Sequence, residues 1–162
     1  MTPALNLLKK AKITHKVHQY QHDPAAESYG LEAAEKLLVD PAQVFKTLVV
    51  KLDDNSLCVA ILPVESMLSM KLVAKVVGAK KAVMADKIDV QRVTGYVLGG
   101  VSPLGQKKRL KTVIDLSAEA FETVFVSAGK RGLEIELSPK DLKLLVHGVF
   151  AQTTVLVDRS GI

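Results

Sequence analysis

The chain has 162 residues, 48% of them hydrophobic, which is enough for one domain with a sizeable core over residues 1–162 and argues against disorder. No apolar run is long enough to cross a bilayer, the N-terminus lacks the layout of a signal peptide, and the lone cysteine excludes an internal disulfide. We therefore expect a cytoplasmic protein without a membrane partner. The formal net charge of +5 permits a polyanionic partner without requiring one.

Short helices and β-forming runs alternate in the first half of the chain. Thr2 and Pro3 have the residue types that favour a helix start, and Asp53, Asp54 and Asn55 form a turn between two apolar runs, as in a β-hairpin. We expect helices over residues 3–11 and 31–38, and strands over residues 15–20, 44–52 and 57–63.

The second half continues the mixture. Ser69 and Asp86 are predicted N-caps of helices that end at Gly78 and near Gly95, and Ser138 begins a further helix that runs to about residue 146. We expect strands over residues 82–85, 112–115, 123–127, 133–137 and 153–157. The sequence shows no repeat and no linker, so it predicts a single mixed α/β or α+β domain.

A glycine-rich loop followed by a basic run stands out at GYVLGGVSPLGQKKR, residues 95–109. Its glycine spacing fits neither the P-loop nor the dinucleotide-binding fingerprint. Ser102 only superficially resembles the nucleophile of a serine hydrolase, because Pro103 has no N–H to give to an oxyanion hole. Further cations form clusters at residues 9–12, 80–81 and 130–131, and phosphate binding is favoured if several clusters converge on one face.

Other reactive side chains have simpler explanations. Cys58 lies in an apolar run without a nearby cation, which favours a buried, unreactive thiol. His15 and His18 point to opposite faces of a strand, and neither a cysteine nor a carboxylate pair completes a metal site with them and His22. The sequence therefore predicts no metal and no cofactor.

Lys46 is the most unusual cation. In VFKTLVV, strand alternation puts it on the same face as Val44, Leu48 and Val50, so a charge interrupts an apolar row. A lysine in such a row pairs with an anionic ligand, or it lies on an edge strand and extends to water. The pattern alone leaves both interpretations open.

Several stretches together resemble a known family. They are MTPALNLLKKAKI, Tyr20 with His22-Asp23-Pro24, VFKTLVV, TGYVLGGVSPLGQKKRLKTVID and VSAGKRGLEIEL. From residue 1 to about residue 147 the chain is similar to the YbaK/EbsC-type Cys-tRNA(Pro) deacylases, which belong to the editing domains associated with prolyl-tRNA synthetase.

The resemblance implies a mixed α/β fold around a barrel-like, largely antiparallel sheet flanked by helices. It also implies a trans-editing hydrolase that removes cysteine from proline tRNA, with prolyl-tRNA synthetase as partner. Such an enzyme uses no protein nucleophile and no metal, because the thiol of the substrate attacks the ester.

The resemblance also assigns site residues. Lys46 and Tyr20 take the catalytic positions. The acidic position is Glu134 or Glu136, between which the sequence does not decide, and Glu136 is taken as the candidate. The remaining substrate-binding positions are Tyr29, Thr47, Gly99, Gly100 and Ser127. The basic run is expected to meet RNA phosphates through Lys107, Lys108, Arg109 and Lys111.

Two other functions stay open. One is an editing hydrolase for another small amino acid, such as alanine on proline tRNA. The other is a non-catalytic RNA- or protein-binding module on the same fold. Aromatic residues make up only 4% of the chain, which leaves few platforms for stacking single-stranded bases. We therefore expect a partner to supply selectivity for the tRNA.

Overall fold

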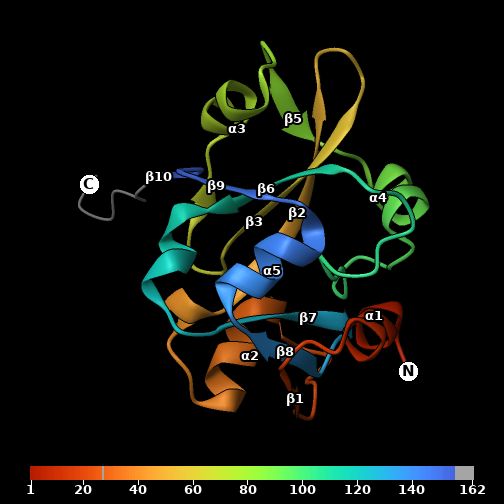
Figure 1. Cartoon of the computed structure of the whole chain (residues 1–162), viewed down its shortest axis with the longest axis vertical. Coiled ribbons are helices and arrows are strands. Elements are labelled where there is room, and N and C mark those ends of the chain that lie inside the picture. The colour runs from red at the N-terminus through yellow and green to blue at the C-terminus, as the bar shows by residue number, and fades with distance from the viewer. Residues whose placement is uncertain (27, 156–162) are drawn as a thin grey trace.

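Two β-sheets form the framework of the protein, and the computed structural model describes residues 1–26 and 28–155 (Figure 1). The five-stranded sheet has the order β5-β2-β3-β6-β9, with β2 at Phe45–Leu52, β3 at Leu57–Pro63, β5 at Ala82–Met84, β6 at Lys111–Asp115 and β9 at Val149–Ala151. The three-stranded sheet has the order β1-β8-β7, with β1 at Lys16–Gln19, β7 at Val124–Lys130 and β8 at Leu133–Leu137. Two short strands, β4 (Met67–Leu68) and β10 (Thr154–Val155), pair separately.

Five α-helices surround these sheets in the described residues. They are α1 (Pro3–Ala11), α2 (Tyr29–Leu37), α3 (Met70–Val77), α4 (Lys87–Thr94) and α5 (Pro139–Val146), with short 3-10 helices at Pro41–Gln43 and Leu116–Ala120. The predicted N-caps are confirmed, because each side chain accepts a backbone N–H of the first turn. The four caps are Thr2, Ser69, Asp86 and Ser138.

The pairing of the strands confirms the mixed α/β class. Strand β3 pairs in parallel with β6, and β6 with β9, whereas every other ladder between the described strands is antiparallel. The sheets touch through a single parallel bridge between Val44 and Phe125. The described strands form open sheets, so the barrel-like arrangement that the resemblance implies is not a closed barrel.

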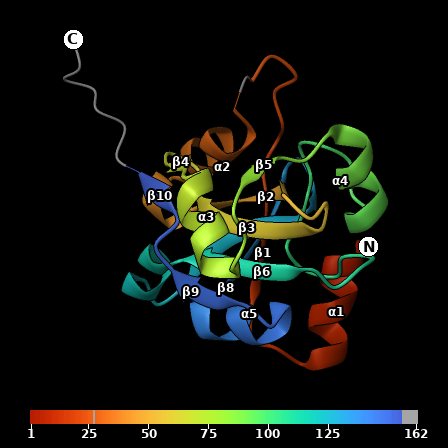
Figure 2. The ribbon, with the colours of Figure 1, turned by 90° about the horizontal axis from the view of Figure 1, so that it is seen from above.

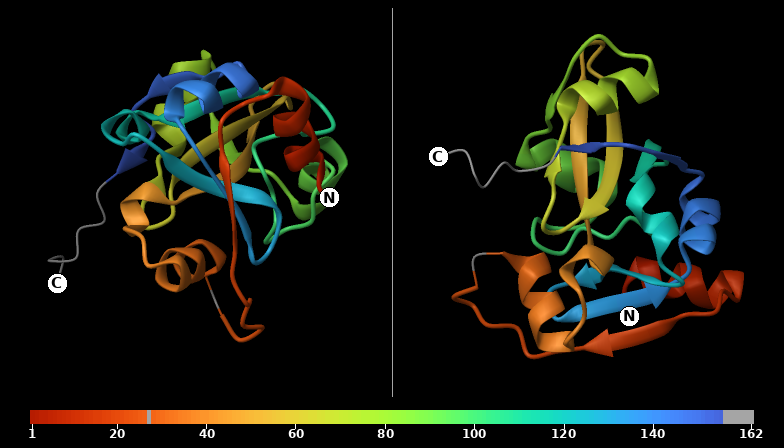
Figure 3. Two further views of the ribbon diagram at one scale, coloured as in Figure 1. Left: turned by 60° about the horizontal axis from the view of Figure 1, so that its bottom comes forward. Right: turned by 90° about the vertical axis from the view of Figure 1, so that its left-hand side faces the viewer.

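The core fills the space between the two sheets and on the far side of the larger one. Alternate residues of β3 face opposite sides: Val59 and Ile61 belong to the main core, and Cys58 and Ala60 pack with residues of α3. Helix α3 lies over β3 (Figure 2). Helices α1 and α2 lie at opposite ends of the three-stranded sheet (Figure 3). Strand β3 is buried on both faces and is a continuous apolar run, whereas β2 is only partly buried and carries Lys46, Thr47 and Lys51.

The structure also contains elements that the sequence did not predict. Strands β4 and β9 are only two and three residues long, too short to produce a recognisable pattern. The predicted strand over residues 153–157 is present at Thr154–Val155, and its last two residues lie outside the described part of the chain. No helix among the described residues is long and apolar enough to traverse a bilayer.

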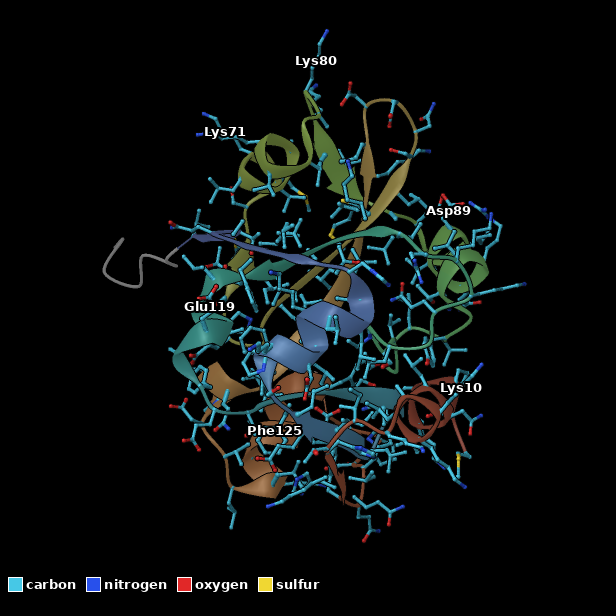
Figure 4. The ribbon with its side chains drawn as sticks, in the orientation of Figure 1. Lys10, Lys71, Lys80, Asp89, Glu119 and Phe125 are labelled. Atoms are coloured by element: carbon cyan, nitrogen blue, oxygen red, sulfur yellow. The ribbon has the colours of Figure 1, made fainter. Side chains whose placement is uncertain are left out.

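Two of the cationic clusters lie far apart. Lys80 projects from one tip of the molecule, and Lys10 lies on α1 in the other half (Figure 4). The electrostatic argument for a phosphate-binding surface therefore depends on particular clusters and not on their sum.

Candidate active site

A cavity of about 350 Å³ opens beside the middle of strand β2, where residues from distant parts of the chain meet. Its volume lies at the lower end of the range typical of small-ligand sites, about 300–1,000 Å³. The wall includes Lys46 and Thr47 from β2, Tyr29 from α2, and Leu98 and Gly99 from the glycine-rich loop. Further lining residues are Tyr20, Ser127, Lys130, Arg131 and Glu134.

The cavity exists because part of the β2 edge lacks a neighbouring strand. On that side β5 pairs with Val50–Leu52, and the Ala85 N–H just after β5 donates to Val49 O. At the other end β7 approaches only at the Val44–Phe125 bridge. In the described structure the segment between these two contacts faces the cavity instead of a strand, and Thr47 within it has a buried hydroxyl oxygen with no hydrogen-bond partner. The strand edge thus supplies polar groups to the cavity wall.

Lys46 is half-buried in this wall. Its Nζ donates to the backbone oxygens of Ser66, at 2.9 Å, and Val64, at 3.4 Å. An ammonium group has three N–H donors, so one remains for a ligand. Burial lowers the pKa of Lys46. The group is therefore a positioned cation in a wall of low polarity, where its field acts more strongly than in water.

Tyr29 connects helix α2 to two other parts of the cavity wall. The Arg131 guanidinium carbon lies 3.6 Å from the centre of the Tyr29 ring, a cation–π contact. Gly99 has φ +92°, and a Cβ on it would lie 2.7 Å from Cε2 of Tyr29. Gly99 is therefore required both by its backbone conformation and by the close approach of the ring.

Gly100 has a different environment from Gly99. A Cβ on Gly100 would lie 3.1 Å from Cα of Lys130, so the loop packs closely against the turn between β7 and β8. The Gly100 N–H donates to Val97 O at 3.0 Å, which leaves it unavailable to a substrate, and Gly100 does not line the cavity. Gly99 thus lines the cavity, whereas Gly100 fits the loop against its neighbours.

Glu134 is the carboxylate of the cavity. It lies directly opposite Ser127 in the β7–β8 pairing, and both side chains line the wall. Only 6% of Glu134 is exposed, and this burial raises the pKa of its carboxyl to about 8. The group therefore holds a proton at neutral pH and is able to donate it or to take it up.

Glu136, the acidic residue taken as the candidate, does not line the cavity. Its carboxylate accepts from the Thr123 hydroxyl at 2.6 Å and lies 2.9 Å from Nε2 of His18. The hydrogen bond from Thr123 lowers its pKa against the opposing effect of burial, and His18 lowers it further. Glu134 and Glu136 share one face of β8, so alternation alone did not separate them.

Tyr20 lies between the cavity and the surface. Burial raises the pKa of its phenol, and the neighbouring Glu134 raises it further. The hydroxyl thus stays protonated at neutral pH and acts as a hydrogen-bond donor or acceptor. Its backbone N–H donates to Gly132 O at 2.9 Å, which fixes β1 against the β7–β8 turn.

The structure therefore brings most of the expected site residues together. Those that line the cavity are Tyr20, Tyr29, Lys46, Thr47, Gly99 and Ser127, whereas Gly100, Glu136 and the basic run Lys107, Lys108, Arg109 and Lys111 do not. Lys108 and Arg109 line a separate groove near α1 and α5. Ser102 is fully buried and accepts the Leu104 N–H within the loop.

Comparison with known proteins places this arrangement in a family. The family model described as "Aminoacyl-tRNA editing domain" matches residues 23–145. The chain belongs to this family. EbsC of Enterococcus faecalis, a protein named for deacylation of Cys-tRNA(Pro) and Cys-tRNA(Cys), is 35% identical over 156 residues, which cover 94% of this chain and 93% of EbsC. As a member, the chain is an aminoacyl-tRNA deacylase.

One further relative and one solved structure are similar to this chain. The proline–tRNA ligase of Desulforamulus reducens is 33% identical over 110 residues, which cover 67% of this chain but only 19% of the ligase. A crystal structure described as a trans-editing enzyme for prolyl-tRNA synthetase superposes with a TM-score of 0.83 at 21% identity, over 95% of this chain and 96% of the other. The latter likeness shows that the fold is shared.

The sequence did not predict that Lys130 and Arg131 line the cavity. Lys130 and Arg131 were recognised only as one basic cluster among several. Their position follows from the β7–β8 turn, which returns to β1 and to the glycine-rich loop. The signal in the sequence was the two glycines that flank these cations, Gly129 and Gly132, and the structure places both at positive φ.

Among the described residues no group of three His, Cys, Asp or Glu side chains is arranged to hold a metal ion.

We predict that Glu134→Gln stabilises the protein increasingly as the pH rises. The folded protein holds the Glu134 proton up to about pH 8, whereas the unfolded chain releases it near the ordinary carboxyl pKa of 4.5. The stability of the wild type therefore falls across this window, and glutamine, which mimics the neutral acid, does not titrate. The gain should reach the order of a few kcal/mol at pH 9 and be small near pH 4.5, as measured by urea unfolding.

Glu136→Gln is the matched control on the same strand. The pKa of Glu136 is lowered in the folded protein, so its contribution is present above the ordinary pKa and is lost in acid. This variant should lose stability at neutral pH. A Glu134→Gln profile parallel to that of the wild type from pH 5 to pH 9 would contradict the assignment of a buried neutral carboxyl.

Proposed function

We propose that the protein hydrolyses the ester between cysteine and proline tRNA, as a trans-editing enzyme. The observation that carries this proposal is the 35% identity to EbsC over nearly the full length of both chains. The cavity agrees with it in size and in composition: it offers a half-buried cation, a buried carboxyl and a phenol around a partly apolar space.

The chemistry of the cavity favours attack by the substrate's own thiol. Its lining contains serine and threonine hydroxyls but neither histidine nor cysteine, so no hydroxyl has a neighbouring imidazole to activate it. In the proposed step the cysteine sulfur attacks the carbonyl carbon, the bond to the tRNA 3′ oxygen breaks, and the thiol proton passes to that oxygen. Water then opens the resulting cyclic thioester and releases cysteine.

Three side chains are positioned to assist this step. The remaining N–H of Lys46 is suited to hold a ribose or carbonyl oxygen while negative charge develops on it. The pKa of Glu134, about 8, lies close to that of a free thiol, about 8.5, so this carboxyl is suited to exchange a proton with the substrate. The Tyr20 phenol beside it is available as a hydrogen-bond donor. Since an aminoacyl ester is already reactive, positioning and electrostatics suffice.

The remaining cations and the partner complete the proposal. The basic run is exposed and is suited to meet RNA phosphates beyond the cavity, through Lys107, Lys108, Arg109 and Lys111. Selectivity for proline tRNA is supplied by prolyl-tRNA synthetase in the cytoplasm, in keeping with the relationship to part of a proline–tRNA ligase.

We predict that hydrolysis depends on the thiol of the substrate. Proline tRNA charged with serine or alanine should be deacylated at least about 100-fold more slowly than the cysteine ester, since neither side chain supplies a thiolate. The measurement is single-turnover deacylation at one enzyme concentration. Equal rates for the three esters would reject thiol assistance and favour an editing hydrolase for another small amino acid.

We predict that Lys46→Ala lowers the rate of deacylation by about 100-fold or more, as expected for loss of an electrostatic donor. Lys51→Ala, on the same strand but outside the cavity, is the matched control and should keep wild-type activity. Circular dichroism checks that both variants fold. Full activity of Lys46→Ala would remove this residue from the mechanism, and absence of hydrolysis by the wild type would favour a binding module.

We predict that the purified protein alone discriminates little between proline tRNA and other tRNAs charged with cysteine. The cavity contains Tyr20, Tyr29 and Phe45 as its aromatic residues, and these leave little surface for reading bases. The measurement compares kcat/KM on several cysteine-charged tRNAs, with and without the synthetase. Strong selectivity without the synthetase would contradict the role assigned to the partner.

A further inference from the structure

A second hollow adjoins the candidate active site. Its volume is about 400 Å³, and it shares Tyr20, Lys130 and Arg131 with the wall of the first cavity. Gln19, Gln21 and His22 form its other polar side chains. The two hollows are therefore neighbours that meet at the side chains of these three residues.

The second hollow is electropositive. Among the described residues its lining includes two permanent cations and no carboxylate. Glu32, beside His22, is already engaged: it lies 3.2 Å from Nδ1 of His22, accepts the Asp23 N–H at 2.8 Å, and lies 3.5 Å from Nζ of Lys36. Within the described residues neither Lys130 nor Arg131 forms an ion pair. The charge of both cations is thus uncompensated.

Arg131 has donors that need an acceptor. Its guanidinium stacks on Tyr29, and its Nε and Nη2 are buried without a hydrogen-bond partner. These two nitrogens lie on one edge of the guanidinium, the edge that binds two oxygens of a phosphate or carboxylate side by side. An unpartnered buried donor is unfavourable, so a ligand oxygen reached by a small rotation of the side chain would be strongly held.

The backbone around the hollow is firmly placed. Arg131 and Gly132 form the turn between β7 and β8, and a Cβ on Gly132 would lie 2.8 Å from Tyr20 O. Tyr20 and Gly132 are also joined by the hydrogen bond from Tyr20 N. The cations therefore project from a turn that is locked against β1, which is suited to a defined binding position.

We propose that this hollow binds the phosphate on the 5′ side of the terminal nucleotide of the tRNA, with Arg131 and Lys130 as its ligands. The inference rests on the proposed function, because it takes the terminal ribose and its cysteine to occupy the first cavity. The RNA strand then leaves across Arg131. It does not leave first along the basic run, since Lys108 and Arg109 line a groove that shares no residue with the first cavity.

The test uses two stable probes, 3′-deoxy-3′-cysteinylamido-adenosine with and without a 5′-phosphate. Their amide bond resists hydrolysis, so binding is measured by calorimetry independently of catalysis. For the wild type the phosphate should increase affinity about tenfold or more, as for a charge-assisted hydrogen bond. This ratio should fall to about one in Lys130→Ala and Arg131→Gln, and below one in Gln21→Glu, which puts a negative charge into the hollow. Because each variant is compared with itself, a uniform loss of affinity cancels.

Lys143→Ala, outside both hollows, is the control and should keep the wild-type ratio; Lys108→Ala tests the competing exit along the basic run. The proposal is overturned if the phosphate gives no gain in the wild type, if the gain survives in both Lys130→Ala and Arg131→Gln, or if it disappears in Lys108→Ala. If the wild type binds neither probe, the proposed function itself is wrong and the phosphate site falls with it.

Discussion

The free stretch of the β2 edge is the constraint on which the site depends. A strand inside a sheet normally has neighbours on both sides, yet β5 pairs with β2 only near its end, and the bridge to β7 lies at Val44, just before β2 begins. The interval exposes the strand to a space instead of to a partner. Lys46 lies in this interval, where two backbone carbonyls hold its ammonium group and one N–H remains for the cavity. The topology of the sheets thus creates the site before any reactive residue is considered.

Burial shifts the pKa values of the two principal ionisable groups of the cavity, Lys46 and Glu134, in opposite directions. It lowers the pKa of Lys46 and raises that of Glu134, so both shifts favour the uncharged form. The ammonium remains charged with the help of two backbone carbonyls, whereas the carboxyl has no comparable donors and stays protonated near neutrality. A net positive cavity with an available proton results, which suits a substrate that develops an oxyanion and releases an alkoxide.

Much of the fold was readable from the sequence because its local signals agree. Caps at Ser69, Asp86 and Ser138, glycine at the end of α3 and the Asp53–Asn55 turn each determine a boundary within a few residues. The relation between the sheets was not readable, since it rests on one bridge between residues 81 positions apart, Val44 and Phe125. The same limit applies to the site. The choice between Glu134 and Glu136, and the approach of Arg131 to Tyr29, depend on how the sheets meet, which no local pattern encodes.

The environment of Cys58 has a consequence for an enzyme that handles thiols. Its side chain is fully buried on β3, and burial raises the pKa of the thiol to about 11. Such a sulfur is almost entirely unionised in a cell and closed to bulky oxidants. Each turnover proposed here liberates an amino acid able to form mixed disulfides. Because the Cys58 thiol does not undergo thiol–disulfide exchange, the released cysteine cannot form a mixed disulfide with the enzyme.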